Sequence, residues 1–277
     1  MITSEIKKEL SSLGISPKKS LGQNFLIREA IYEKIISAVE PASEDNIIEI
    51  GPGLGTLTQY LAKSGAKIIA VEKDRDLIGH LTSKLIKSKN VTIIEGDILK
   101  FKVEDLNLEP TKYKVVGNIP YYITSHLLRR ILEKWPKPKS ITLLVQKEVA
   151  KRIVAKPPNM SMLGVSVQYY SSPKIISYVS KSNFLPQPKV DSAIIKLEPR
   201  VNNQESRINS EKFFKTARAG FAEKRKQLIN NLSAGLKLSK KSVEEKLNLI
   251  DIDPKRRAET LTIEEWSIIT KALLSQD

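Results

Sequence analysis

The sequence predicts an α/β protein in which a doubly wound, mostly parallel sheet with an antiparallel edge precedes a small, all-helical C-terminal domain. Three observations carry this prediction. Short β-branched runs alternate with longer helical patterns through the first half of the chain, two further strand-like runs follow across a short loop, and no strand-like run appears after residue 203. Such alternation indicates βαβ units and a sheet covered on both faces.

Each predicted strand is a short apolar run. Five of them fall at residues 46–50, 67–72, 91–95, 113–117 and 140–146, and a final pair falls at residues 174–180 and 190–198. Helical patterns are predicted between and after the first five strands, at residues 56–64, 75–87, 124–135, 147–154 and 163–170. The loop that joins the final pair is short, which suits an antiparallel pair better than a crossover.

The two ends of the chain differ from this central part. Residues 1–26 are polar and basic, with a short helix at 2–13, and Pro17 and Gly22 argue against a continuous helix beyond it. A helix with regular apolar spacing then covers 27–39. The C-terminal patterns predict helices at 210–220, 224–232, 239–248 and 262–274. We therefore predict a first domain at residues 1–200 and a second at residues 201–277.

The charge of the chain favours a polyanionic partner. Its 277 residues include 46 Lys and Arg against 31 Asp and Glu, a formal net charge of +15. Residues 200–257 alone carry 15 basic and 7 acidic residues, so the predicted helical domain is strongly basic. A basic surface attracts phosphates and releases their counterions. The alternative is a solvated, lysine-rich surface.

Several classes of protein are excluded by composition. The chain has no cysteine, which removes disulfides, thiolate nucleophiles and zinc ribbons, and we expect no metal site. No apolar run approaches the ~18–20 residues that a membrane span needs, and the N-terminus lacks the apolar region of a signal peptide. We therefore expect a cytoplasmic protein without a membrane partner.

A glycine-rich turn follows the first predicted strand of the sheet. Gly51, Gly53 and Gly55 give the spacing G-x-G-x-G instead of the G-x-G-x-x-G of dinucleotide-binding turns, and Pro52 removes one N–H. No Walker lysine is present. Such a turn allows close approach of a ligand to the backbone but argues against a phosphate cradle. The alternative is an ordinary βα turn.

Two acids follow the next strands. Glu72 ends the second strand of the sheet, where an acid binds the ribose hydroxyls of an adenosine-bearing cofactor. Asp97, just after the third strand, is a candidate acceptor for an adenine amino group. Ligands of open α/β sheets bind beyond the carboxyl ends of the strands, where both acids lie. S-adenosyl-L-methionine has no phosphates, so it explains why the chain lacks the phosphate-binding spacing and the Walker lysine. The alternative is that Glu72 and Asp97 are solvated acids in ordinary turns.

The segment Asn118-Ile119-Pro120-Tyr121-Tyr122 follows the fourth strand of the sheet. It combines a carboxamide, a ring that fixes φ and a flat aromatic face with a polar tip. These groups suit the grip of a planar base that carries an amino group. A strand-ending turn with half-buried tyrosines is the alternative. We expect Tyr121 to stack on the base and Tyr122 to pack beneath the loop.

With these elements in order, the chain resembles the S-adenosylmethionine-dependent adenine N6-methyltransferases, and more closely the KsgA-type dimethyltransferases of small-subunit ribosomal RNA. Further motifs that carry the resemblance are residues 19–26 (KSLGQNFL), 183–193 (NFLPQPKVDSA), 221–228 (FAEKRKQL) and 257–261 (RAETL). The resemblance implies a Rossmann-like class I methyltransferase sheet of seven strands. It also implies that residues 1–26 close over the cofactor.

The resemblance implies a role for individual residues on the cofactor side. Asn24 and Leu26 match positions that close over the methionine part of S-adenosyl-L-methionine. Gly51, with Gly53, matches the turn that contacts the cofactor. Glu72 matches the ribose-binding acid, and Asp97 matches the residue that faces the adenine ring.

On the substrate side, Asn118 matches the residue that touches both the cofactor and the target amino group, and Tyr121 and Phe184 match the aromatic positions that sandwich the target base. We hypothesise that Asn118 Oδ1 and the Pro120 carbonyl accept the two hydrogens of the amine. The run of Lys224, Arg225 and Lys226, in the basic domain, is the candidate RNA contact.

The implied reaction is dimethylation at N6 of two adjacent adenosines in a hairpin near the 3′ end of 16S ribosomal RNA. The partner is this RNA within the small subunit or its precursor, and the protein is expected to be a monomer. Three alternatives stay open. These are methylation of one adenine in large-subunit RNA, as in the erythromycin-resistance relatives, a binding or assembly factor that retains the fold, and a DNA adenine methylase.

Overall fold

The computed structural model describes residues 2–14, 16–200 and 209–274, and the chain forms two compact units. The first unit comprises Met1–Ala150 with Ser171–Pro199, and the second comprises Lys151–Tyr170 with Arg200–Asp277. The sequence-based division at residue 200 places residues 151–170 in the first domain, whereas the structure groups them with the second unit.

A seven-stranded sheet forms the centre of the first unit, in the order β4-β3-β2-β5-β6-β9-β7. The strands are β2 (Asn46–Ile50), β3 (Lys67–Glu72), β4 (Val91–Glu95), β5 (Tyr113–Asn118), β6 (Ser140–Gln146), β7 (Ser171–Val179) and β9 (Ser192–Pro199). The first five run parallel to one another. Strand β9 lies antiparallel between β6 and β7. The predicted mostly parallel sheet with an antiparallel edge is confirmed.

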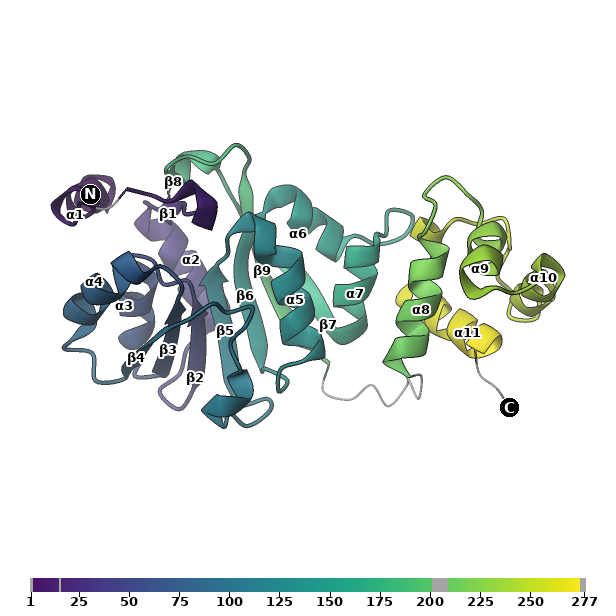
Figure 1. Ribbon diagram of the computed structural model, residues 1–277, viewed down its shortest axis with the longest axis horizontal. Coiled ribbons are helices and arrows are strands. Elements are labelled where there is room, and N and C mark those ends of the chain that lie inside the picture. The colour runs from purple at the N-terminus through teal and green to yellow at the C-terminus, as the bar shows by residue number, and fades with distance from the viewer. Residues whose placement is uncertain (1, 15, 201–208, 275–277) are drawn as a thin grey trace. The chain divides into compact units, whose positions relative to one another are not determined.

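Helices cover both faces of this sheet (Figure 1). They are α2 (Glu29–Val39), α3 (Thr56–Ala62), α4 (Arg75–Leu85) and α5 (Thr124–Glu133). Helix α6 (Lys147–Val154) follows β6 and spans the boundary between the two units. Ile35 of α2 and Leu61 of α3 are buried in one cluster with Ile47 of the sheet, while Leu81 of α4 belongs to a second cluster. Because the central strands are buried on both faces, their apolar runs are continuous rather than alternating.

The N-terminal segment is fixed to the first unit at two places. Helix α1 (Ile2–Ser12) buries Ile6 and Leu10 in the cluster that contains α4. On either side of the short helix η1 (Lys19–Leu21), Lys18 Nζ and Gln23 Nε2 lie 2.5 and 2.6 Å from the two carboxylate oxygens of Asp74, the N-cap of α4. A buried carboxylate with two such partners holds the preceding loop in place.

A two-stranded sheet that the sequence did not predict joins two of its motifs. Strand β1 (Phe25–Leu26) pairs antiparallel with β8 (Phe184–Leu185), which lies between β7 and β9 in the chain. Leu26 is opposite Phe184 in this pair. Residues 19–26 and 183–193, which are far apart in the sequence, are therefore neighbours in the first unit.

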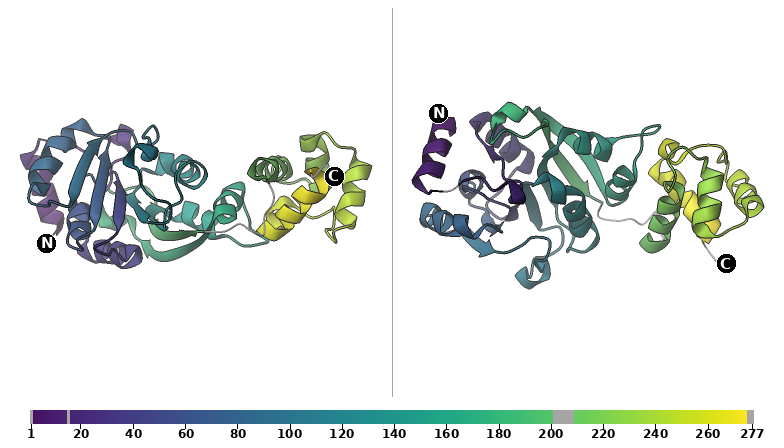
Figure 2. Two further views of the ribbon diagram at one scale, coloured as in Figure 1. Left: turned by 90° about the horizontal axis from the view of Figure 1, so that it is seen from below. Right: turned by 45° about the horizontal axis from the view of Figure 1, so that its top comes forward.

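The second unit is helical in its described part, as predicted. It contains α7 (Met162–Tyr170), α8 (Ser210–Gly220), α9 (Leu228–Leu236), α10 (Lys240–Asn248) and α11 (Ile263–Leu274), of which the last four gather in one bundle (Figure 2). Trp266 is fully buried, and Gly220 leaves room for it, since a Cβ there would lie 2.2 Å from the indole. Tyr169 of α7 contacts Phe213 with ring centroids 4.2 Å apart, which explains why residues 151–170 belong to this unit.

The helix expected at residues 224–232 instead begins at Leu228, so this prediction is wrong at its start. The amides of Leu228 and Ile229 donate to the carbonyls of Arg256 and Pro254 at 2.7 and 3.1 Å. These bonds satisfy the first helical N–H groups with partners outside the helix. Residues 221–227 form turns. Among the described residues, no helix is long and apolar enough to cross a membrane.

Candidate active site

The glycine turn after β2 forms one wall of a pocket at the carboxyl edge of the parallel strands. Gly51, Gly53 and Gly55 all have positive φ, at 66°, 60° and 75°, a region that side chains other than glycine rarely occupy. A Cβ placed on Gly51 would meet no atom within 4 Å, although Gly51 lines the pocket. The turn therefore leaves open space for a ligand to approach the backbone.

Glu72 ends β3 and lies on the pocket wall, only 6% exposed. Its Oε1 accepts the N–H groups of Lys73 and Asp74, each at 2.8 Å, and its Oε2 accepts that of Gly53 at 3.0 Å. Burial raises the pKa of this carboxyl, against the lowering effect of the three donors. Because a carboxylate offers about four acceptor positions, one remains on Oε2 for a ligand hydroxyl.

Asp97 follows β4 and lines the same pocket. Its Oδ2 lies 2.9 Å from Lys73 Nζ, and its Oδ1 accepts the amide of Leu99 at 3.0 Å. Partial burial raises the pKa of this carboxyl, but the hydrogen bonds from Lys73 and Leu99 outweigh burial, so the net pKa is lowered. Asp97 is therefore an ionised acceptor at the strand end where the sequence predicted one.

Glu49 is a pocket residue that the sequence analysis did not assign. It lies within β2, lines the pocket and is 1% exposed, and burial raises its pKa to about 8. Its Oε2 has no hydrogen-bond partner among the described residues. A single acid among the three isoleucines of the strand NIIEI is the sequence signal that identifies it, since an unpaired buried acid is costly.

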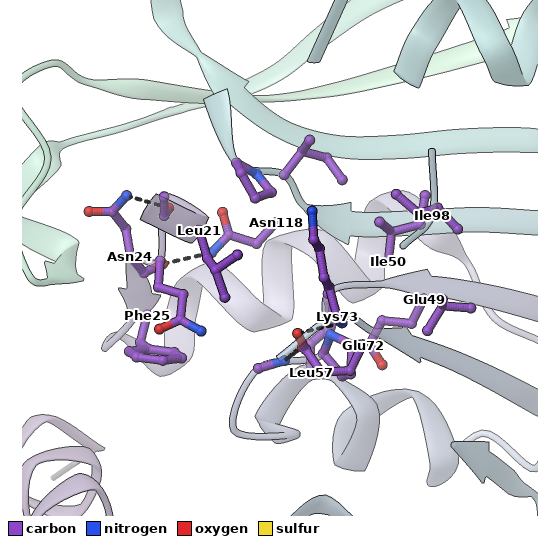
Figure 3. A pocket seen from close by; sticks show the side chains of 18 of the residues that line it. Leu21, Asn24, Phe25, Glu49, Ile50, Leu57, Glu72, Lys73, Ile98 and Asn118 are labelled. Carbon is purple, nitrogen blue, oxygen red and sulfur yellow. Dashed lines mark hydrogen bonds between the residues drawn. The ribbon is translucent and has the colours of Figure 1, made fainter. Parts of the chain in front are cut away.

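Asn118, the last residue of β5, is half-buried at the mouth of the pocket. Its Nδ2 donates to the backbone carbonyl of Asn24 at 2.9 Å (Figure 3). Because a carboxamide is planar, this bond also fixes the direction of Oδ1, which remains an acceptor. The Pro120 carbonyl accepts the amide of Ile123 at 3.1 Å and keeps one further acceptor position.

Asn24 and Leu26 lie where the N-terminal segment crosses the pocket. The side chain of Asn24 donates to the Gly22 carbonyl at 3.0 Å, so this segment forms a compact loop. Leu26 is 3% exposed. The pocket thus brings together every predicted cofactor residue, from the N-terminal segment and from the ends of β2, β3, β4 and β5.

Of the two predicted base-stacking residues, Tyr121 lines the pocket and Phe184 does not. Tyr121 lines the pocket, and its hydroxyl lies 2.7 Å from Ser192 Oγ. Tyr122 is 63% exposed, so the expectation that it packs beneath the loop is wrong. Residues Tyr121–Ile123 form a 3-10 turn in which Ile123 takes the buried position. Phe184 is 3% exposed in the core cluster of α2 and does not line the pocket.

Lys224, Arg225 and Lys226 lie in the second unit, in the turns between α8 and α9, and all three are exposed. Lys226 Nζ is 4.0 Å from Glu223, a surface pair of small energetic weight. Lys224 and Arg225, the two residues before it, present their charges to solvent in the same turn.

The sheet order, with an antiparallel strand inserted beside the edge, and a pocket at its carboxyl edge define a Rossmann-like class I methyltransferase fold. The model of the ribosomal RNA adenine dimethylase family matches residues 14–274. The chain therefore belongs to the ribosomal RNA adenine dimethylase family.

Individual relatives agree with this membership. A ribosomal RNA small subunit methyltransferase A of Dehalococcoides mccartyi (strain CBDB1) is 44% identical over 266 residues, which cover 96% of this chain and 91% of the relative. The crystal structure of a dimethyladenosine transferase from Plasmodium falciparum is similar with a TM-score of 0.76 at 26% identity, covering 88% of this chain and 95% of that one. The 23S rRNA methyltransferase ErmE gives 0.72 at 26% identity, covering 90% and 99%.

Proposed function

We propose that this protein transfers methyl groups from S-adenosyl-L-methionine to N6 of two adjacent adenosines in a hairpin near the 3′ end of 16S ribosomal RNA. The product is N6,N6-dimethyladenosine, and the substrate is the small subunit or its precursor. The protein acts as a monomer in the cytoplasm during biogenesis of the subunit. The family membership and the 44% identity to a relative named as a small-subunit methyltransferase support this proposal.

The observation that carries the proposal is the orientation of Asn118. Its Nδ2 is committed to the Asn24 carbonyl, so Oδ1 is the atom that meets an amino group at the pocket mouth. With the Pro120 carbonyl it offers two acceptors, one for each hydrogen of an adenine amine. Gripping both hydrogens favours a pyramidal nitrogen, whose lone pair becomes available for reaction.

The pocket fits S-adenosyl-L-methionine. The open space at Gly51 lets the cofactor approach the backbone. The free acceptor position on Glu72 Oε2 suits a ribose hydroxyl, and the ionised Asp97 suits the adenine amino group. The residues at 24 and 26 face the methionine part of the cofactor. When bound, the cofactor supplies an electrophilic methyl group. The Glu49 carboxyl, whose Oε2 has no partner among the described residues, is buried in the same pocket.

The remaining contribution of the chain is alignment, which supplies up to about 7–11 kcal/mol in the best cases. No general base is required before transfer, because the ammonium product is acidic and loses its proton afterwards. Tyr121 lies at the pocket and stacks on the base. Stacking by Phe184 as well requires its ring to leave the core cluster in which it is buried.

We assign a substrate contact to Lys224, Arg225 and Lys226 as well. The three exposed cations occupy one turn of a strongly basic unit, and such a cluster binds phosphates without reading their sequence. Their contribution is to affinity for the ribosomal RNA, not to the chemistry.

Transfer of tritiated S-adenosyl-L-methionine to small subunits from a strain that lacks this methylation tests the proposal. We expect label in dimethyladenosine of the small-subunit RNA. The similarity to ErmE makes large-subunit RNA the second candidate. Label confined to large-subunit RNA, or to DNA, overturns the assignment to 16S RNA.

A further inference from the structure

An exposed apolar surface lies at the end of the sheet that is nearest to Tyr121. In the described part of the chain, seven large hydrophobic side chains are exposed, and three of them lie on β7 or on the segment that precedes β9. These three are Ile176, Tyr178 and Val190. Exposed apolar side chains along one edge of a sheet are typical of an interaction site.

Tyr178 is the largest side chain on β7, the edge strand of the sheet, and it is 52% exposed. The ammonium of Lys147, at the start of α6, lies 5.4 Å from the centroid of the Tyr178 ring. Lys147 Nζ is also 3.8 Å from Asp191 Oδ2. We call Tyr178 and Lys147 together the β7 platform. An aromatic face beside a cation suits a nucleotide, which has a flat base and a negative phosphate.

The β7 platform is continuous with the proposed base site. Ser192 of β9, whose Oγ lies 2.7 Å from the Tyr121 hydroxyl, pairs with Val179 of β7. Tyr178 is the residue before Val179 in the chain and pairs with Ala193. A chain of hydrogen-bonded neighbours therefore connects the Tyr121 ring to the platform along the carboxyl ends of β5 and β7.

Charge on the adjoining loop favours an RNA strand over a protein as the occupant. Lys181 and Lys189 are both exposed on the segment that joins β7 to β9. Asp191 and Glu148 are the acids of this region, and Asp191 is already engaged by the backbone amide of Lys181 and by Lys147. An exposed aromatic with lysines around it is the usual composition of a single-strand platform.

We propose that the β7 platform binds a nucleotide that flanks the target adenosine, with its base stacked on Tyr178 and its phosphate near Lys147. The single-stranded loop of the RNA then lies across the end of the sheet from Tyr121 to β7. This inference rests on the proposed function, because it takes the target base to be held at Tyr121. It gives the first unit its own contribution to substrate selection.

The test compares Tyr178→Ala with Tyr178→Phe, which keeps the ring, in the full chain. The RNA is a hairpin that carries the target adenosines, with the fluorescent base 2-aminopurine placed at each flanking position in turn. We expect wild type and Tyr178→Phe to quench 2-aminopurine at one flanking position. Tyr178→Ala should lose this quenching and bind the hairpin about tenfold more weakly, as the loss of one stacked base predicts.

Kinetics and a control variant separate the platform from general damage. Tyr178→Ala should raise the KM for RNA and leave kcat unchanged, since the platform does not touch the reacting atoms. Ile86→Ala removes a side chain that is 75% exposed on the far part of the first unit and should change neither value. Thermal unfolding of each variant confirms that it is folded.

Two results overturn the proposal. One is a Tyr178→Ala variant with wild-type RNA affinity and wild-type quenching. The other is a Tyr178→Ala variant whose self-association, measured by light scattering, changes while its RNA binding does not. That result would make the exposed side chains of β7 a protein interface. If wild type itself fails to methylate the hairpin and small subunits but still quenches 2-aminopurine through Tyr178, the proposed function fails and the platform stands.

Discussion

The cofactor side and the base side of the pocket are built in different ways. On the cofactor side, Glu49 and Glu72 are 1% and 6% exposed, and three backbone amides hold the Glu72 carboxylate. On the base side, Tyr121 is half-buried and Tyr122 is 63% exposed. One half is buried and preformed, and the other presents apolar surface to solvent.

The difference follows from what each half binds. A small polar cofactor gains most from groups whose positions are already fixed, because little ordering remains to oppose binding. A large RNA can cover exposed rings when it binds, and the burial of their apolar surface then contributes to affinity. Asn118 lies between the two sides, because its Nδ2 donates to the Asn24 carbonyl of the N-terminal segment and its Oδ1 is the proposed acceptor for the amine of the base.

The largest expected effect is at this boundary. Asn118→Ala should reduce turnover by about 100-fold or more, the loss that removal of one preorganised transition-state partner produces. Affinity for S-adenosyl-L-methionine should stay within about threefold, because the glycine turn, Glu72 and Asp97 still hold the rest of the cofactor. Single-turnover methyl transfer and calorimetric titration of the cofactor measure the two quantities. A fall in turnover of less than about tenfold would contradict the assigned role.

Glu72→Gln should weaken cofactor binding by about tenfold or more, since a hydrogen bond to a charged acceptor contributes about 1.5–3 kcal/mol. Glu95→Gln is the matched control. Glu95 is the register partner of Glu72 on the adjacent strand, but it is paired with Arg75 and does not line the pocket. Titration calorimetry should find the control unchanged. Equal losses for both variants would mean that the acids act only through their general charge.

Replacing Lys224, Arg225 and Lys226 by alanine tests whether RNA affinity has a source outside the pocket. We expect the slope of log affinity against log salt concentration to fall by about 2–3, roughly one for each phosphate that the variant no longer neutralises. Cofactor affinity should not change. Removing the exposed Lys237, Lys240 and Lys241 of the same unit is the charge-matched control, and an identical slope change there would show that position within the unit does not matter.

The smallest expected effect is a change in the pH dependence of stability. Burial raises the pKa of Glu49 from 4.5 to about 8, so between these values the unfolded chain has released a proton that the folded chain keeps. The free energy of unfolding therefore falls as pH rises from 4.5 to 8. Glu49→Gln should flatten this fall, measured by urea unfolding of the cofactor-free protein. Glu72, whose pKa is also raised, leaves part of the slope in place.

An unchanged slope in Glu49→Gln would mean that another group causes the pH dependence of stability, and it would weaken the contrast between the two halves of the pocket. A control at Glu95, which is about half exposed, should leave the slope as it is in wild type.

The sheet could be predicted because each of its strands carries a local signal. The apolar runs at 46–50, 67–72 and 91–95 coincide with β2, β3 and β4. The interior strands β2 and β3 are mostly buried and need apolar sequence, and the edge strand β4 carries the signal of its β-branched residues. The pairing of β1 with β8 could not be predicted, because a strand of two residues has no periodicity. The start of α9 depends on amide contacts to the distant residues Pro254 and Arg256, which no local pattern contains.

The site followed the same rule. Glu72, Asp97 and Asn118 could be placed because each stands at the end of a recognisable strand. The burial of Phe184 and the exposure of Tyr122 depend on tertiary packing, so the sequence alone did not determine them. Glu49 was visible as an acid in an apolar strand, but its unpartnered oxygen appears only in the fold.

The most direct test of the central claim is the number of methyl groups transferred to each small subunit, with the nucleoside product identified by mass spectrometry. Two adjacent adenosines that each receive two methyl groups give about four methyl groups per subunit, all in N6,N6-dimethyladenosine. Asn118→Ala should give almost none, because transfer requires Asn118 Oδ1 to hold the amine in place. A product that stops at monomethyladenosine, or full transfer by Asn118→Ala, would contradict the account.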